Sequence, residues 1–281
     1  MTKLKYRFTN DVLCKMLFVR YQDLLKRLIA QILRIRFEDI EDFVITNPEI
    51  PPDFAGEKFC RLDINMKVNG DRIDLEVQIA NEGDYPERSL YYWAREFSSE
   101  LGEGEEYLNL PRTIVISILG FKLFNCAEFH SEFQPLEVTR HTPLTDKQVL
   151  HYFELPKLPE VKNADDELRL WLSLFKAETE EELSKIQELG APVMEQAIEA
   201  YRQITATNEF KEIERLRSRA RHNEASALGH ARREERKRWE KTVAEKDAVL
   251  AEKDAIHAKT VAENERLRAQ IAELQAHSGE R

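Results

Sequence analysis

Apolar residues recur at helical spacing in two successive runs over residues 10–36. Thr9 and Asn10 are good N-caps for the first run. The pattern predicts two short helices, or one broken helix. The apolar positions are Val12, Leu13, Met16 and Leu17, and then Leu24, Leu25, Leu28, Ile29, Ile32 and Leu33.

Alternating apolar and polar residues over 60–79 predict a β-hairpin. Asn69-Gly70 separates the two alternating runs and is a preferred pair for a two-residue turn. Such a turn places Val68 opposite Asp71. Counting five residues away from the turn along each strand then places Asp63 opposite Glu76. One face of the hairpin then points to a core through Leu62, Ile64, Met66, Val68, Ile73, Leu75 and Val77.

The rest of the first 160 residues predicts further strands and one helix. A helix is expected over 87–101, and the apolar run 112–119 is typical of a central buried strand. Other strands are predicted at 43–46, more weakly at 136–140, and at 149–155. This order of elements predicts an α/β layer built around a mixed sheet flanked by helices.

Beyond residue 160 the pattern becomes helical. We expect a helix around Trp171, another from Pro192 to about Thr207, and one long charged helix over 208–277, with an interruption conceivable near Gly229. We therefore divide the chain into a domain of residues 1–160, a helical extension of 161–207 and a long helix of 208–281.

The last part of that helix shows a heptad pattern. Asn264, Leu267, Ile271 and Leu274 fit alternating a and d positions, and a polar residue at an a position tends to fix a dimer. The upstream seam is poor, with lysines at two d positions. A short coiled coil that forms a homodimer and a solvated single helix both remain open.

Composition narrows the class of protein. The chain has 281 residues, 42% of them hydrophobic, enough for a packed core. No apolar run approaches the length of about 20 residues that a membrane span needs, so we expect a soluble, cytoplasmic protein. The three cysteines have no paired spacing, and we expect Cys14 and Cys60 to be small buried hydrophobes. The seven histidines show no metal-ligand pairing in the sequence.

Charge is distributed unevenly along the chain. The net charge is −10, yet residues 1–36 carry +7 and residues 211–240 carry +4, which leaves 37–210 near −20. An acidic average does not exclude nucleic acid, because phosphate responds to local basic surface. It does make strong non-specific affinity for DNA less favourable.

The facing carboxylates of the predicted hairpin are the candidate chemistry. Asp63 and Glu76 would have β-carbons roughly 5 Å apart, an arrangement that destabilises a sheet unless something neutralises it. A divalent cation bound by both would do so. An ordinary solvated face is the alternative, since Lys67 and Arg72 form a like-charged pair on the same face.

Several segments in order resemble one known family. They are Asn10–Phe18, Leu62-Asp63, Leu75–Gln78, Glu87–Ala94, Gly104–Tyr107, the strand Ile114–Leu119, Leu144–Asp146 and Glu154–Lys157. Their order and spacing resemble the PD-(D/E)XK nuclease family transposases, bacterial proteins also called recombination-promoting nucleases. The resemblance covers residues 8–160 and, more loosely, the helical tail.

The resemblance implies a restriction-endonuclease-like fold that cuts DNA with a divalent metal. By it, Asp63 and Glu76 are the acidic ligands, the Val77 carbonyl adds another oxygen, and Gln78 stands where the wider superfamily has a lysine. Hard oxygen ligands suit Mg²⁺, with Mn²⁺ as a substitute, and the metal would polarise the phosphate and activate water. A neutral amide at 78 can orient water but adds no positive charge, so a non-catalytic DNA-binding or assembly protein is the alternative.

Other residues take subsidiary places in this interpretation. Lys15 or Arg61 could supply the missing charge, and Asp11 would reach the metal side of the sheet. Otherwise Asp11 and Lys15 form a simple ion pair four residues apart on one helix. Asp74 either joins the site or, more simply, is solvated. Arg88, Tyr91 and Tyr92 could meet DNA, although helical aromatics more often belong to a core.

Overall fold

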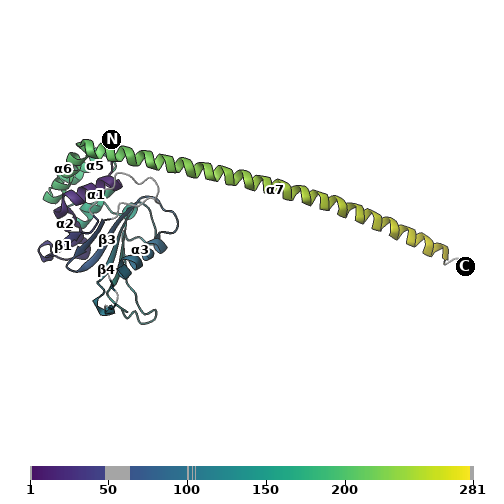
Figure 1. Cartoon of the computed structure of the whole chain (residues 1–281), viewed down its shortest axis with the longest axis horizontal. Helices are drawn as coiled ribbons and strands as arrows, with labels where there is room; N and C mark the ends of the chain where they lie inside the picture. The colour runs from purple at the N-terminus through teal and green to yellow at the C-terminus, as the bar shows by residue number, and fades with distance from the viewer. Residues whose placement is uncertain (1, 48–63, 100, 103, 105, 279–281) are drawn as a thin grey trace. The chain divides into compact units, whose positions relative to one another are not determined.

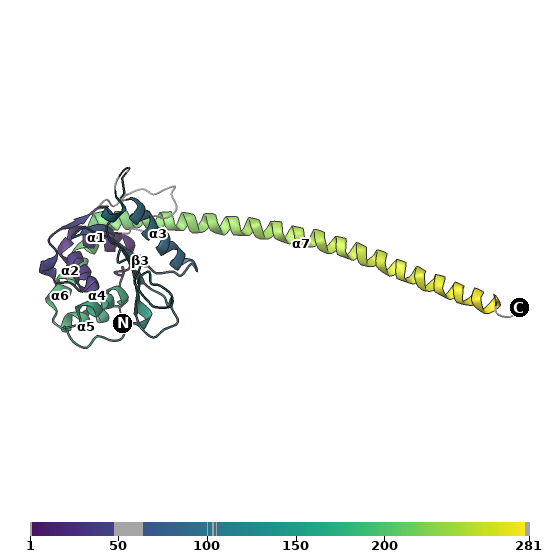
Figure 2. The same ribbon diagram turned by 90° about the horizontal axis from the view of Figure 1, so that it is seen from below.

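The computed structural model describes residues 2–47, 64–99, 101–102, 104 and 106–278. Its centre is one six-stranded mixed sheet in the order β1-β2-β3-β4-β6-β5. The strands are β1 (Phe43–Ile45), β2 (Ile64–Val68), β3 (Asp71–Gln78), β4 (Thr113–Leu119), β5 (His130–Phe133) and β6 (Gln148–Glu154). Helices lie on both faces (Figures 1 and 2), with α1 and α2 on one side and α3 on the other. The predicted α/β fold is confirmed.

The hairpin forms in the predicted register. Val68 lies opposite Asp71 and Ile64 opposite Leu75. Asn69 and Gly70 have φ of 49° and 88°, values that a two-residue turn of this hand requires and that Asn and Gly tolerate best. The register on which the facing carboxylates depend is therefore observed up to Ile64, while Leu62 and Asp63 lie outside the described residues.

The central strands run parallel and are buried on both faces. β3 pairs with β4, and β4 with β6, both in parallel. Every residue of β4 is buried, as its apolar run predicts. The carboxyl ends of the three strands, at Gln78, Leu119 and Glu154, meet at one edge of the sheet.

One strand was predicted in the wrong place. Residues 136–140 form a turn, with a single bridge between Leu136 and Pro143, and His141 has a φ of 55°. The strand beside β6 is β5, His130–Phe133, which pairs antiparallel with it. β5 is a short outer strand with little apolar alternation, so its sequence gives a weak signal.

The two faces of the sheet carry different cores. The larger core includes Leu75 and Phe153 and is covered by α1 (Asp11–Arg20), α2 (Gln22–Leu33) and α4 (Glu167–Lys176). The smaller core includes Val115 and Tyr152 and lies under α3 (Tyr85–Ser99). Because neighbouring residues of a strand face opposite sides, Glu76 and Gln78 lie on the α3 face.

Three helices follow the sheet before the long one. They are α4, α5 (Glu180–Glu188) and α6 (Pro192–Ala206). The sequence predicted α4 and α6 but not α5, whose residues are mostly charged. A Thr179–Glu182 capping box begins α5. Cys14 is buried in α1, as predicted, and burial raises the pKa of its thiol to about 12.

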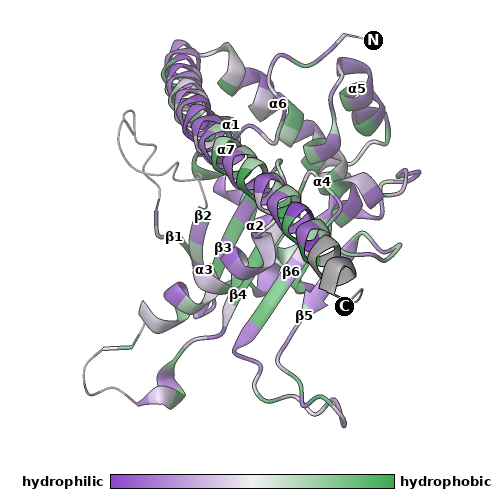
Figure 3. Cartoon of the chain, turned by 90° about the vertical axis from the view of Figure 1, so that its right-hand side faces the viewer, coloured by the Kyte–Doolittle hydropathy of each residue, from purple (hydrophilic) through white to green (hydrophobic). Residues whose placement is uncertain are grey.

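The long helix is α7, Asn208–Ser278, and it continues through Gly229 without a break. The chain divides by its contacts into Met1–Arg217 and Ser218–Arg281. Most residues along α7 are hydrophilic (Figure 3). None of the helices in the described ranges is long and apolar enough to cross a membrane.

Candidate active site

Glu76 is a fully buried carboxylate in the middle of the sheet. Its side chain has 0% exposure and extends from β3 toward α3. The hydroxyl of Tyr85, the first residue of α3, donates to Glu76 Oε2 at 2.6 Å. The Ser117 hydroxyl of β4 lies 2.9 Å from the same Tyr85 oxygen. A strand, its parallel neighbour and a helix therefore fix this carboxylate together.

Tyr85 remains protonated in this arrangement. Its ring is fully buried, and burial raises the pKa of its hydroxyl well above the ordinary value. The Glu76 carboxylate raises that pKa further, because ionising the hydroxyl would place two negative charges side by side. Tyr85 is therefore a permanent hydrogen-bond donor to Glu76 at any ordinary pH.

Gln78 lies two residues beyond Glu76 on the same face. Its side chain is 5% exposed, and its Nε2 donates to the Ala80 carbonyl at 2.6 Å. Its own backbone carbonyl accepts from the Gly120 N–H at 2.8 Å. With the amide nitrogen engaged, the side-chain oxygen is the atom that Gln78 presents as an acceptor.

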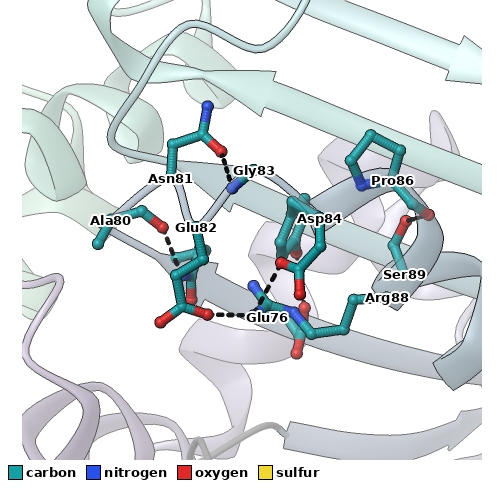
Figure 4. Close-up of polar contacts among 11 residues, drawn as sticks. Glu76, Ala80, Asn81, Glu82, Gly83, Asp84, Pro86, Arg88 and Ser89 are labelled. Carbon is teal, nitrogen blue, oxygen red and sulfur yellow. Dashed lines mark hydrogen bonds and ion pairs between the residues drawn. The ribbon is translucent and has the colours of Figure 1, made fainter. Parts of the chain in front are cut away.

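The loop after β3 is held by its own polar groups (Figure 4). Asn81 Oδ1 accepts from the Gly83 N–H at 2.9 Å, and Arg88 pairs with Glu82 at 2.8 Å and with Asp84 at 3.8 Å. The Arg88 guanidinium also lies over the Tyr85 ring, 4.8 Å from its centroid. These contacts fix the beginning of α3 and so the direction of the Tyr85 hydroxyl.

A second hydroxyl pair joins α3 to the sheet. Ser89 Oγ and the Tyr152 hydroxyl of β6 lie 2.6 Å apart, and Ser89 Oγ also donates to the Pro86 carbonyl at 2.8 Å. Burial raises the pKa of Tyr152, although the contact with Ser89 opposes this. The polar network beneath α3 thus extends from β3 across to β6.

Val77 is placed on the other face from Glu76, as the alternation of β3 requires, and its side chain packs against the larger core. Asp63 and Arg61 lie outside the described residues. The roles predicted for these three residues in metal or charge binding stay predictions.

Asp11 and Lys15 belong to the layer on the opposite face from Glu76. Asp11 Oδ2 accepts from the Arg217 guanidinium of α7, and Lys15 is buried at 4% exposure within α1. The contact with Arg217, only 8% exposed, ties the start of α1 to the first turns of α7. A structural function of Asp11 is thereby visible, while its predicted catalytic role, like that of Lys15, stays a prediction.

The remaining candidates divide between interior and surface. Asp74 is 4% exposed, so the expectation of a solvated side chain was wrong: α3 covers this face of β3. Tyr91 is 61% exposed and contacts Tyr92. Tyr91 is thus a surface residue, contrary to the usual fate of helical aromatics.

The comparison with family models decides the class of protein. The model for PD-(D/E)XK nuclease family transposases matches residues 8–231, most of the chain. This chain belongs to that family. No curated protein and no solved structure matches it.

In this transposase-family protein, the residues that hold Glu76 could not be recognised directly from the sequence. Tyr85 reaches Glu76 only through the tertiary fold. Ser117 could have been noticed, because it is a polar residue within the apolar run of β4. A polar side chain in a buried strand generally has a hydrogen-bond partner.

Two histidines and a glutamate also come together elsewhere in this transposase-family chain. His130, Glu132 and His151 each offer a ligand atom, and these atoms lie within 4.8 Å of one another. The sequence itself shows no metal-ligand spacing among the histidines, and it is the fold that brings these ligand atoms together. The two histidines are 21 residues apart in the sequence and meet only because β5 pairs with β6.

Proposed function

We propose that this protein is a Mg²⁺-dependent endonuclease that hydrolyses DNA phosphodiester bonds during recombination or transposition. Family membership implies a nuclease acting on DNA. The observation that carries the proposal is Glu76, fixed at a parallel strand by the Tyr85 hydroxyl and followed on the same face by Gln78.

The donor set fits a hard cation. A carboxylate has about four acceptor positions, and the Tyr85 hydroxyl uses one of those of Glu76. Asp63 and the Val77 carbonyl are the proposed further oxygen ligands, and oxygen ligands are what Mg²⁺ and Mn²⁺ bind. When bound, the metal would polarise the phosphate and lower the pKa of an attacking water.

The protein's own contribution is positioning. Tyr85 holds one Glu76 oxygen, so the carboxylate cannot rotate freely. Gln78 donates to Ala80, which leaves its side-chain oxygen to accept from a water molecule and orient it. Asp11 and Lys15 are proposed as supporting residues by resemblance alone.

A non-catalytic DNA-binding or assembly protein is the second candidate function. The 0% exposure of Glu76 favours it, because a catalytic ligand has to be approached by the metal and the phosphate. The absence of a lysine at position 78 and the charge near −20 over residues 37–210 point the same way. In that case Glu76 and Tyr85 serve only to stabilise the fold.

Plasmid cleavage tests the two functions against each other. Wild type is compared with Glu76→Gln and Asp63→Ala in Mg²⁺, Mn²⁺ and Ca²⁺. Glu128→Gln serves as the matched control, because Glu128 is exposed. We expect cleavage with Mg²⁺ or Mn²⁺, no cleavage by Asp63→Ala, and a loss of about 100-fold or more in Glu76→Gln. Salt-sensitive DNA binding without cleavage in any of these metals would instead establish the second function.

The C-terminal helix is proposed to form a homodimer. Leu267 and Ile271 occupy d and a positions of the heptad pattern and are 50% and 54% exposed in the single chain. Covering these side chains with a second copy removes apolar surface from water.

A further inference from the structure

We propose that His130, Glu132 and His151 form a binding site for a divalent transition-metal ion, of which Zn²⁺ best matches the ligands. The site is separate from the proposed nuclease centre.

The pairing of β5 with β6 brings the three residues together. Glu132 and His151 are directly opposed in the antiparallel ladder. His130 lies two residues before Glu132 on the same strand, and residues two apart share a face. The backbone hydrogen bonds between β5 and β6 therefore fix the Cα positions of all three ligand residues.

The nitrogen spacing suits a shared ion. His130 Nε2 and His151 Nδ1 are 3.0 Å apart. Two imidazole nitrogens bound to one tetrahedral Zn²⁺ are separated by about 3.3 Å, given Zn–N bonds of about 2.05 Å. Without metal, one of the two nitrogens donates to the other. Metal binding replaces this contact once the donor ring has moved its hydrogen to its other nitrogen.

Packing restrains the two rings before any ion binds. The His130 ring stacks on Phe153 at 4.3 Å between centroids and 10° between planes. His151 is 4% exposed, and its ring is also nearly parallel to that of His130. Little side-chain entropy is therefore left to lose on binding.

Glu132 completes the set from the solvent side. It is exposed, so it offers an ion a path of entry and can move toward the histidines. Gln134 Nε2 donates to Glu132 Oε1 at 3.2 Å, a contact that helps to orient the carboxylate. The nearby cations Arg34 and Arg112 oppose a bound dication. Glu132 offsets them, and Arg112 is itself paired with Asp71 at 3.6 Å.

The position and chemistry of this cluster distinguish it from Glu76. His151 lies in register with Ile116, which lies in register with Leu75, so the cluster is on the larger-core face of the sheet. Glu76 is on the opposite face and two strands away. Two imidazoles with one carboxylate favour Zn²⁺ and related transition metals, whereas Mg²⁺ prefers oxygen ligands alone.

Calorimetric titration with Zn²⁺ of the full-length, chelator-treated protein tests the site. We expect one equivalent to bind to wild type, and His130→Gln and Glu132→Gln each to weaken binding about 10-fold or more. His257→Gln is the matched control, since His257 is exposed on α7. Glu76→Gln should also bind Zn²⁺ as wild type does, which separates this site from the nuclease centre.

Co²⁺ provides a second measurement. Visible absorption bands of bound Co²⁺ should appear in wild type and be lost in Glu132→Gln. Because Glu132 is exposed, its substitution should not disturb folding, and the loss would report the missing ligand. Absence of Zn²⁺ binding, or binding unchanged in both cluster variants, would show that the two histidines are only a hydrogen-bonded pair and overturn the proposal.

Discussion

The Glu76 carboxylate is removed from water, so protein groups have to replace its hydration. The Tyr85 hydroxyl is one such group, at 2.6 Å. Because Glu76 and Tyr85 are both buried beneath or within α3, this hydrogen bond stabilises the fold as well as positioning the carboxylate of the candidate site.

Tyr85→Phe tests how much this contact contributes. The variant keeps the ring but removes the hydroxyl that donates to the buried carboxylate, so we expect the free energy of unfolding to fall by about 1–3 kcal/mol in urea titrations. Tyr91→Phe is the control, because Tyr91 is 61% exposed and its loss should be nearly neutral. Equal free energies of unfolding for Tyr85→Phe and Tyr91→Phe would show that the Tyr85 hydroxyl does not stabilise the fold.

His151 makes the stability of the metal-free protein depend on pH. Burial lowers the pKa of its imidazole to about 4, from an ordinary 6.5, against the opposing effect of Glu132. In acid the unfolded chain binds the proton more readily than the folded one, so stability falls as pH drops from 6.5 toward 4. Chelator-treated wild type should lose more stability over this range than His151→Asn, as measured by urea unfolding at each pH.

Among the elements, the hairpin shows most clearly how a local signal determines a large part of the sheet. Asn69 and Gly70 both have positive φ, and Asn69 Oδ1 also accepts from the backbone of Glu41 and Asp42. The turn therefore fixes the β2–β3 register. It also holds the backbone at Glu41 and Asp42, just before β1, against the end of the hairpin.

Gly70→Ala and Gly229→Ala should change stability in opposite directions. Gly70 has a φ of 88°, so a Cβ there strains the turn by about 1 kcal/mol or more. Gly229 lies inside α7 with ordinary space around a Cβ, so alanine should favour the helix by about 0.5–1 kcal/mol. Urea unfolding measures the first variant, and helical circular dichroism during heating the second. A stabilising Gly70→Ala would refute the turn geometry.

Elements with strong local signals could be predicted from the sequence. The apolar run of β4, the turn at Asn69 and the helical pattern of the charged tail each act over neighbouring residues. β5 and α5 were not predicted, because His130–Phe133 and Glu180–Glu188 carry few apolar residues. For α5, the Thr179–Glu182 capping box is a local signal of the helix start that the apolar pattern alone does not use.

The same distinction applies to the candidate site. Glu76 and Gln78 follow from the alternation within one strand, so the sequence indicates that they share a face. Tyr85, Ser117 and the His130–His151 pair depend on contacts between elements, and no spacing in the chain gives them.

For the whole molecule, the proposed homodimer is the property most open to measurement. Light scattering should find a dimer of the full chain, and the double variant Leu267→Lys with Ile271→Lys should be monomeric. Ala269→Lys places the same charge at an f position, away from the seam, and should leave the dimer intact. A monomeric wild type at every concentration would exclude this association.

Among the described strands, the two outermost, β1 and β5, have three and four residues. Outer strands expose unpaired backbone groups that can recruit a foreign strand, and short ones offer little length for it. The long, apolar β4 lies well inside the sheet. This protein should therefore resist fibril-like stacking through its sheet, even at the high local concentration that the proposed homodimer would bring.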